Sequence, residues 1–177
     1  ALPPFAFRHR LIPAVHDVVA ARFRGTAPDL CAIYAAVTAL SANAALRGEG
    51  GPYSVRAGSV FVRIRGQEEL APGPAGRGGK GTSSHAWAGR RHPSGRAEVA
   101  DLSTRQFNAW AASLEIPPEV RFPRAVWAFE DEVPRAFRYV ADAEATARAR
   151  ESLRNARADD VADAVREVME RMREGSG

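Results

Sequence analysis

The sequence predicts one α+β domain, and 177 residues suffice for one domain with a full hydrophobic core. Three observations lead to this prediction. Leu30–Leu46 is an alanine-rich helical segment, the segments after it are short and strand-like, and from Ala141 to Gly175 the chain has neither internal Gly nor Pro. Helices and strands that do not strictly alternate are typical of α+β proteins. We therefore expect a central buried helix packed on a small antiparallel sheet, with a long C-terminal helix.

The N-terminal part is expected to form an arm and two helices. Ala1–Arg10 contains two prolines and predicts an extended surface arm. Leu11–Arg24 has apolar residues at helical spacing. The next helix begins after an N-cap supplied by either Thr26 or Asp29 and continues to about Leu46. Its alanines allow close approach, which is why we expect it at the centre of the core.

Short segments in the middle of the chain are expected to form the antiparallel sheet. They share alternating or β-branched residues and flanking turn signals. They are Val55–Arg65, Ser84–Arg90, Arg96–Leu102, Ala125–Phe129 and Ala136–Val140. Between the third and fourth of these, Thr104–Leu114 predicts a helix that Ser103 can cap.

The glycine-rich segment Gly66–Thr82 predicts a long loop or lid beside the next strand. A phosphate-binding loop is disfavoured, although Gly79 and Lys80 match the end of that motif. Pro74 occupies the place of its first glycine, and Gly81 follows Lys80 where Ser or Thr is needed.

The hairpin of Ser84–Arg90 and Arg96–Leu102 brings a histidine toward an aspartate. With a turn at His92–Gly95, facing residues have numbers that sum to about 186 to 188. His85 then lies opposite Asp101 or close to it, and a register offset of zero or two residues puts both side chains on one face. A histidine held by an aspartate is the oriented base of nucleophilic catalysis.

Cys31 is the one cysteine of the chain, so an internal disulfide and a cysteine-rich zinc site are excluded. Its position near the start of the central helix matters because unpaired backbone N–H groups and the helix dipole favour a thiolate there and can stabilise an oxyanion. A buried structural cysteine is the alternative. We expect no cofactor and no metal, since the four histidines show no paired ligand spacing. We expect His9, His16 and His92 to be solvated or capping groups.

The charge balance does not favour a nucleic-acid binder. The chain has 25 basic and 21 acidic residues, and Lys80 is the one lysine. The arginines are interleaved with acidic residues, so no basic stripe forms, and their excess over lysine fits a GC-rich bacterial genome. No apolar run approaches the roughly 20 residues that span a bilayer. We therefore expect a cytoplasmic protein with no membrane contact.

The order of these residues resembles the transglutaminase-like branch of the papain-like cysteine enzymes, over roughly residues 28–103. A cysteine opens a small-residue helix, a strand carries His85-Ala86-Trp87, and the neighbouring strand ends in Asp101-Leu102. Carried over by position, the resemblance implies that Cys31 is the nucleophile, His85 the base and Asp101 the residue that orients the base. It also implies a papain-like α+β fold.

The resemblance implies a cysteine hydrolase or acyltransferase that acts on amide, ester or thioester carbonyls, with a peptidase, isopeptidase or deamidase favoured. A protein or peptide is then the expected substrate. Trp87 shares the strand face of His85 and is expected to shield the imidazole or to line the substrate groove. No Gln precedes Cys31, so a second oxyanion donor is expected either from the backbone or from a residue such as Tyr53 or Trp87. The alternative is a non-catalytic protein-binding module with the same fold.

The domain organisation is expected to be residues 1–140 as the α+β domain and 141–177 as a helical extension. The extension is one helix, or two that break near Arg157–Asp160. A narrow apolar seam of Val161, Val165, Val168 and Met172 predicts packing on the domain itself or on a partner helix.

Overall fold

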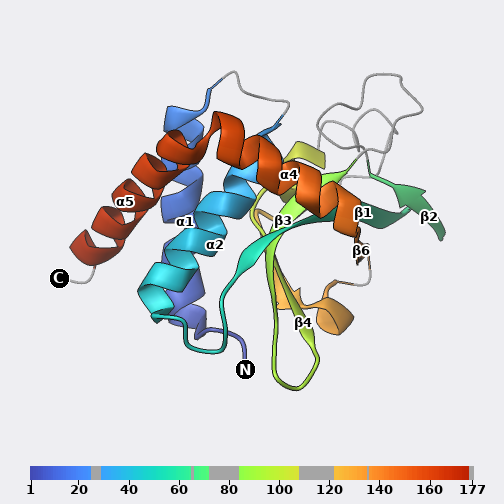
Figure 1. The fold of residues 1–177 in the computed structure, drawn as a ribbon. Helices are drawn as coiled ribbons and strands as arrows, with labels where there is room; N and C mark the ends of the chain where they lie inside the picture. Colours follow the sequence, from blue (N-terminus) through green and yellow to red (C-terminus); the bar gives the residue numbers. More distant parts are fainter. Residues whose placement is uncertain (25–28, 65, 72–83, 108–121, 135, 176–177) are drawn as a thin grey trace.

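The computed structural model describes residues 1–24, 29–64, 66–71, 84–107, 122–134 and 136–175. The described part has the expected α+β architecture, with helices packed around an antiparallel sheet (Figure 1). Within it, no helix is both long enough and apolar enough to cross a membrane.

Four α-helices of the described part are α1 (Phe5–Arg22), α2 (Leu30–Leu46), α4 (Ala143–Ala156) and α5 (Ala158–Glu174). Helix α2 lies between the sheet and the pair formed by α1 and α5, and it contacts β1 and β3 as well as both helices. Ten of its residues are buried, five of them alanines, which explains how so many elements can approach it. The central position predicted for this helix is confirmed.

The strands are β1 (Ser54–Ile64), β2 (Gln67–Leu70), β3 (His85–Arg91), β4 (Ala97–Asp101), β5 (Val126–Phe129) and β6 (Phe137–Ala141). They lie in the order β2-β1-β3-β4-β5, and β6 pairs with β1 outside this path. All these pairings are antiparallel. Short 3₁₀-helices, Thr104–Gln106 (η2) and Glu130–Glu132 (η3), follow β4 and β5.

Strand β1 is the strand that organises the sheet. Gly58 faces His85 of β3 on one edge and Ala141 of β6 on the other. A Cβ atom at Gly58 would lie 2.0 Å from the carbonyl oxygen of Val140, so the close approach of β6 requires glycine here. Where β6 ends, α4 covers the same edge of β1, because the Thr146 hydroxyl both accepts from the N–H of Ala57 (2.9 Å) and donates to its carbonyl (3.1 Å).

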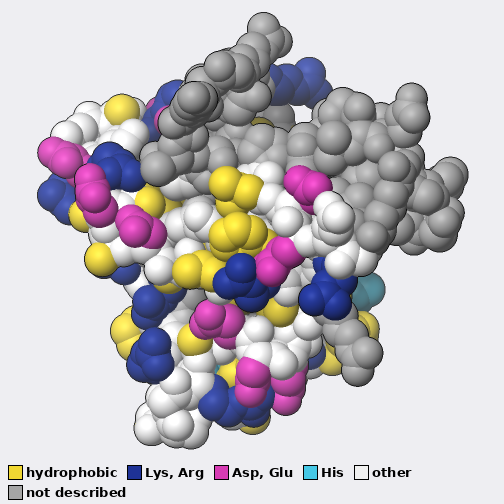
Figure 2. Space-filling view, turned by 90° about the vertical axis from the view of Figure 1, so that its right-hand side faces the viewer, with side chains coloured by type: hydrophobic (Ala, Val, Ile, Leu, Met, Phe, Trp, Pro, Cys, Tyr) yellow, Lys and Arg dark blue, Asp and Glu magenta, His cyan; other side chains and the backbone are white. Residues whose placement is uncertain are grey.

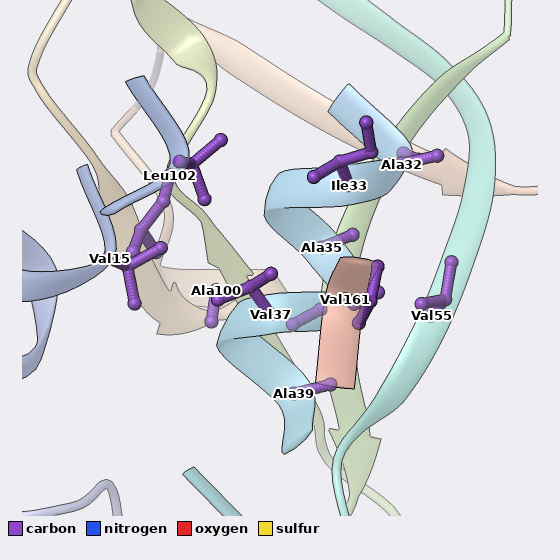
Figure 3. Packing of buried hydrophobic residues seen from close by; sticks show 14 of the residues in the cluster. Val15, Ala32, Ile33, Ala35, Val37, Ala39, Val55, Ala100, Leu102 and Val161 are labelled. Carbon is purple, nitrogen blue, oxygen red and sulfur yellow. The ribbon is translucent and has the colours of Figure 1, made fainter. Parts of the chain in front are cut away.

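Two apolar clusters lie on the two faces of the sheet. The first gathers α1, α2 and α5 with the alanines at positions 86, 88 and 100 of β3 and β4 (Figure 3). The second contains Trp87, Val99, Phe107 and Tyr139. Alternation along β3 and β4 separates them, since successive side chains of a strand point to opposite faces.

The N-terminus differs from its prediction. Residues 5–10, expected in an extended arm, form the first turns of α1, and Pro13 lies inside the same helix. The helix continues through Pro13 because its apolar face packs on α2 and α5, where Val15, Val18 and Val19 are fully buried. Tertiary burial here outweighs the local preference of proline.

Parts of the predicted loop and helix lie outside the described residues. The segment Gly66–Thr82 was expected to be a loop, but its start forms β2, which pairs with the end of β1. The proposed lid, with Lys80, lies outside the described part, as does most of the helix expected at Thr104–Leu114.

The C-terminal segment forms two helices that meet at Arg157, which was one of the two arrangements predicted. Helix α4 packs on β1, and α5 packs on α1 and α2. Val161, Val168 and Met172 of the predicted seam are buried against these helices. The seam therefore packs on the chain itself.

Candidate active site

Cys31 lies in the first turn of α2, directly after Leu30. Asp29 occupies the N-cap position, but its carboxylate makes no capping hydrogen bond and instead accepts from Arg157 Nε at 2.9 Å. The Asp29 carboxylate therefore does not compete with a bound oxyanion for the N–H groups of the first turn. This ion pair also ties the start of α2 to the junction of α4 and α5.

His85 and Asp101 are in direct contact, as the hairpin register predicts. Ala88 pairs with Ala100 across β3 and β4, so facing residue numbers sum to 188, at the upper end of the expected range. This register offsets His85 from Asp101 by two residues and leaves both on the same face. The His85 Nε2 lies 2.8 Å from Asp101 Oδ2, and both side chains are 1 % exposed.

Cys31 is the second partner of the His85 imidazole. The sulfhydryl is close enough to the ring to raise the pKa of His85, and Cys31 is itself 3 % exposed. Since Nε2 is engaged by Asp101, Nδ1 is the ring nitrogen available to the sulfur. The three residues named from the sequence are therefore brought together: Cys31 from α2, His85 at the start of β3 and Asp101 at the end of β4.

Asp101 accepts further hydrogen bonds that the sequence did not reveal. The Tyr139 hydroxyl donates to Oδ2 at 2.7 Å, and the backbone N–H and hydroxyl of Ser103 donate to Oδ1 at 3.0 and 3.1 Å. Ser103 therefore orients Asp101 and makes no capping bond to the helical turn that follows it. With His85, both carboxylate oxygens are satisfied, which fixes the carboxylate plane.

The surroundings set the protonation of the pair. Burial lowers the pKa of His85, but the charge of Asp101 and the hydrogen bonds to Asp101 and Cys31 outweigh burial and raise this pKa to about 10. Burial raises the pKa of Asp101, but the His85 charge and the donors from His85, Tyr139 and Ser103 bring it below its ordinary value. An imidazolium paired with a carboxylate is therefore the favoured state at neutral pH.

Aromatic side chains surround the imidazole. The Trp87 ring stacks with His85 at a centroid distance of 6.3 Å, and the Phe107 ring lies at 4.8 Å. Trp87 is 2 % exposed and also packs against Tyr139. Trp87 thus shields the imidazole, which is one of the two roles expected of it.

Tyr53 lies in a second polar cluster and not beside the cysteine. Its hydroxyl donates to Glu98, a carboxylate that also accepts from Trp127 Nε1 at 2.8 Å, Arg90 Nε at 2.8 Å and His92 Nε2 at 2.7 Å. Arg90 is five residues beyond His85 along β3, roughly 17 Å away at the rise of a strand. Tyr53 is therefore committed to Glu98 and is not placed as an oxyanion donor.

The Glu98 cluster was missed in the sequence, and it corrects one expectation. His92 is buried against Glu98 and Phe129, whereas a solvated turn residue was expected. The sequence contained one signal for this cluster. Glu98 and Ala100 are two residues apart on one strand and share a face, so Glu98 is a charged residue at an inward-facing position. His16 is also buried, with its Nε2 donating to the carbonyl of Leu102 at 2.7 Å.

A pocket of about 240 Å³ opens beside the start of β3. Gly58, Ser59 and Ser84 line it from the sheet, and Asp142 and Arg148 line it from α4. Because Ser84 precedes His85 and Gly58 faces it, this hollow adjoins the strand end that carries the histidine. Among the described residues, no group of three or more His, Cys, Asp or Glu side chains is arranged to hold a metal ion.

Comparison with known proteins gives a likeness in fold. No family model matches the sequence, and no curated protein matches it significantly. A solved crystal structure, that of genomics APC5867, superposes with a TM-score of 0.58 over 90 % of this chain and 75 % of its own, at 14 % sequence identity. At that identity the likeness extends to the α+β fold alone.

Proposed function

We propose that this protein is a cysteine-dependent hydrolase or acyltransferase of the transglutaminase-like, papain-like type. The substrate is an amide, ester or thioester carbonyl, and peptidase, isopeptidase or deamidase chemistry is favoured. The observation that carries the proposal is the hydrogen bond between His85 and Asp101, together with a Cys31 sulfhydryl close enough to the imidazole to raise the pKa of His85. A cysteine helix packed on adjacent antiparallel strands that bear His and Asp also fits a papain-like fold.

In the proposed reaction, the proton of the Cys31 thiol resides on the His85 imidazolium, and the thiolate sulfur attacks the substrate carbonyl carbon. The C–S bond forms, and the imidazolium gives its proton to the leaving amine, alcohol or thiol as its bond to the acyl carbon breaks. The neutral imidazole then takes a proton from the attacking water or amine, and breakage of the C–S bond releases an acid or an amide and restores the thiolate–imidazolium pair. Throughout, Asp101 holds the Nε2–H and stabilises the imidazolium.

The first turn of α2 can support the developing oxyanion. Cys31 is the second helical residue, where backbone N–H groups have no partner within the helix. The Asp29 carboxylate leaves these groups uncapped because it binds Arg157.

A specific observation favours the second candidate, a non-catalytic protein-binding module. Cys31, His85 and Asp101 are each at least 97 % buried, and a buried, fully bonded set of side chains can serve packing alone. The two candidates differ in whether a reagent or a substrate reaches the sulfur in the folded protein.

The pH dependence of Cys31 alkylation by iodoacetamide distinguishes the two candidates. Because the chain has one cysteine, intact-protein mass spectrometry reports this single thiol. We expect rapid labelling well below pH 8 that collapses in His85→Ala, while His9→Ala, a surface histidine variant, labels like the wild type. Labelling that begins only when the protein unfolds would overturn the enzyme proposal and favour the binding module.

A further inference from the structure

Arg105 and Arg124 are two exposed arginines that have no acidic partner among the described residues. In the described part of the chain, neither takes part in a hydrogen bond or an ion pair, whereas Arg22, Arg90, Arg96, Arg138, Arg157 and Arg171 all have acidic partners. On the face shown in Figure 2, acidic and basic side chains are interspersed. Arg105 and Arg124 belong to the arginines of the described part whose charge no carboxylate of that part neutralises.

The fold brings together the two segments that carry these arginines. The Thr104 hydroxyl donates to the carbonyl of Pro123 at 2.6 Å, and Arg105 and Arg124 are the residues that follow these two partners. The charges of both arginines also act on His16, whose Nε2 holds the carbonyl of Leu102. Both guanidinium groups thus lie beside the segment that continues directly from Asp101.

The same pair adjoins the turn that carries the cysteine. Tyr34 follows Cys31 by three residues, so their side chains are neighbours on one face of α2. The Tyr34 ring packs edge-on to His16 at a centroid distance of 5.7 Å. Burial raises the pKa of Tyr34, and the charge of Arg105 opposes this rise, which places Arg105 within electrostatic range of the first turns of α2.

The other groups on this side do not cancel the positive charge. Burial lowers the pKa of His16, so its ring is neutral at pH 7. Asp17 faces the same region from α1, but it has its own cation, Arg171, at 3.8 Å. Two guanidinium groups thus have no acidic partner among the described residues, and this arrangement attracts a carboxylate, which a guanidinium binds through two parallel hydrogen bonds.

We propose that Arg105 and Arg124 bind a carboxylate of the substrate beside the bond attacked by Cys31, so that the substrate is an acidic peptide. The carboxylate belongs either to an acidic side chain or to a free C-terminus. This inference rests on the proposed cysteine chemistry and adds the class of substrate to it.

The test compares alkylation of Cys31 by iodoacetate, which carries a carboxylate, with alkylation by neutral iodoacetamide. The ratio of the two rates cancels effects that act equally on both reagents. We expect Arg105→Gln and Arg124→Gln each to lower this ratio about threefold at low ionic strength, as expected for one nearby unit charge in a solvent-exposed site. Salt should lower the wild-type ratio and leave that of the double variant nearly constant.

Arg91→Gln is the matched control. It removes the same charge from an exposed residue at the opposite end of β3 from His85, and its ratio should equal that of the wild type. Two chloroacetylated dipeptides then distinguish the two kinds of carboxylate. One carries its carboxylate on a glutamate side chain and the other at the C-terminus. The peptide whose rate of reaction with Cys31 falls more in the double variant carries the carboxylate that the arginines bind.

Equal ratios in the wild type and in the Arg105 and Arg124 variants would overturn this inference. An equal fall of the ratio in Arg91→Gln would also overturn it, because the fall would then come from the net charge of the protein. If neither reagent labels the folded protein, the proposed cysteine chemistry fails. If both reagents label it without a preference for the carboxylate, only the inference about Arg105 and Arg124 fails.

Discussion

Tyr139 and His85 donate to the same oxygen of the Asp101 carboxylate. The hydroxyl of Tyr139 lies 2.7 Å and the His85 Nε2 lies 2.8 Å from Oδ2. The tyrosine comes from β6 and the histidine from β3, two strands that flank β1 on opposite edges. The orientation of the histidine therefore depends on a strand that is distant in sequence.

Tyr139→Phe should weaken this arrangement without disturbing its packing, since the ring against Trp87 is retained. The lost hydrogen bond is to a charged group, so we expect the free energy of unfolding to fall by about 2 kcal/mol. Because the hydroxyl helps to lower the pKa of Asp101, the acid limb of the Cys31 alkylation profile should move to higher pH. Urea unfolding and alkylation rates measure the two effects. An unchanged acid limb would mean that Tyr139 has a packing role alone.

The His85–Asp101 pair should give a pH-dependent difference in stability between the wild type and Asp101→Asn. The pKa of Asp101 is lowered on folding, so its contribution is present above 3.8 and is lost as the pH falls through the lower folded value. The pKa of His85 is raised to about 10, so its contribution is complete below 6.5 and is lost as the pH rises toward 10.

The difference in unfolding free energy should therefore be largest near pH 5 to 6 and shrink steadily by pH 9.5. Urea unfolding at pH 5.5, 7.5 and 9.5 measures it. Asp159→Asn, on the exposed first turn of α5, is the control and should show no such trend. A difference that grows toward pH 9.5 would contradict the ion-pair state.

Glu98→Gln should be strongly destabilising. Glu98 is 1 % exposed and accepts from four side chains, of which Arg90 is also buried. Removing the carboxylate charge leaves the guanidinium of Arg90 buried without its counter-ion, which costs about 3 kcal/mol. Glu132→Gln, which breaks an exposed ion pair with Arg96, should cost less than about 1 kcal/mol. Comparable losses in the two variants, measured by urea unfolding, would refute a central role for Glu98.

Gly58→Ala should disrupt the contact between β1 and β6. The added methyl group would lie 2.0 Å from the carbonyl oxygen of Val140, so a backbone must move. Overpacking of this kind costs about 1–3 kcal/mol, and we expect a value at the upper end. Ser59→Ala, at the neighbouring half-buried position, is the control and should be nearly neutral. Thermal unfolding compares the two, and an undiminished midpoint for Gly58→Ala would argue against this close strand pairing.

The sequence was sufficient for features that depend on local periodicity. Alternation along the hairpin predicted that His85 and Asp101 share a face in two of the three registers expected for the turn, and the observed register is one of these two. The alanine content of residues 30–46 likewise determined that the cysteine helix would be buried. The break of the C-terminal segment at Arg157 was one of two arrangements that the sequence left open.

Other features depended on long-range pairing, which no local pattern encodes. The strand at Phe137–Ala141 was expected, but only the fold determined that it pairs with β1 and so brings Tyr139 to Asp101. Burial of Leu11, Val15 and Val18 against other helices stabilises α1, and residues 5–10 extend this helix in spite of the nearby prolines. The same long-range packing assigned Tyr53 to Glu98. The sequence by itself determined the chemical groups and their local faces, while the tertiary structure decided which distant groups meet, because burial and strand pairing act over the whole chain.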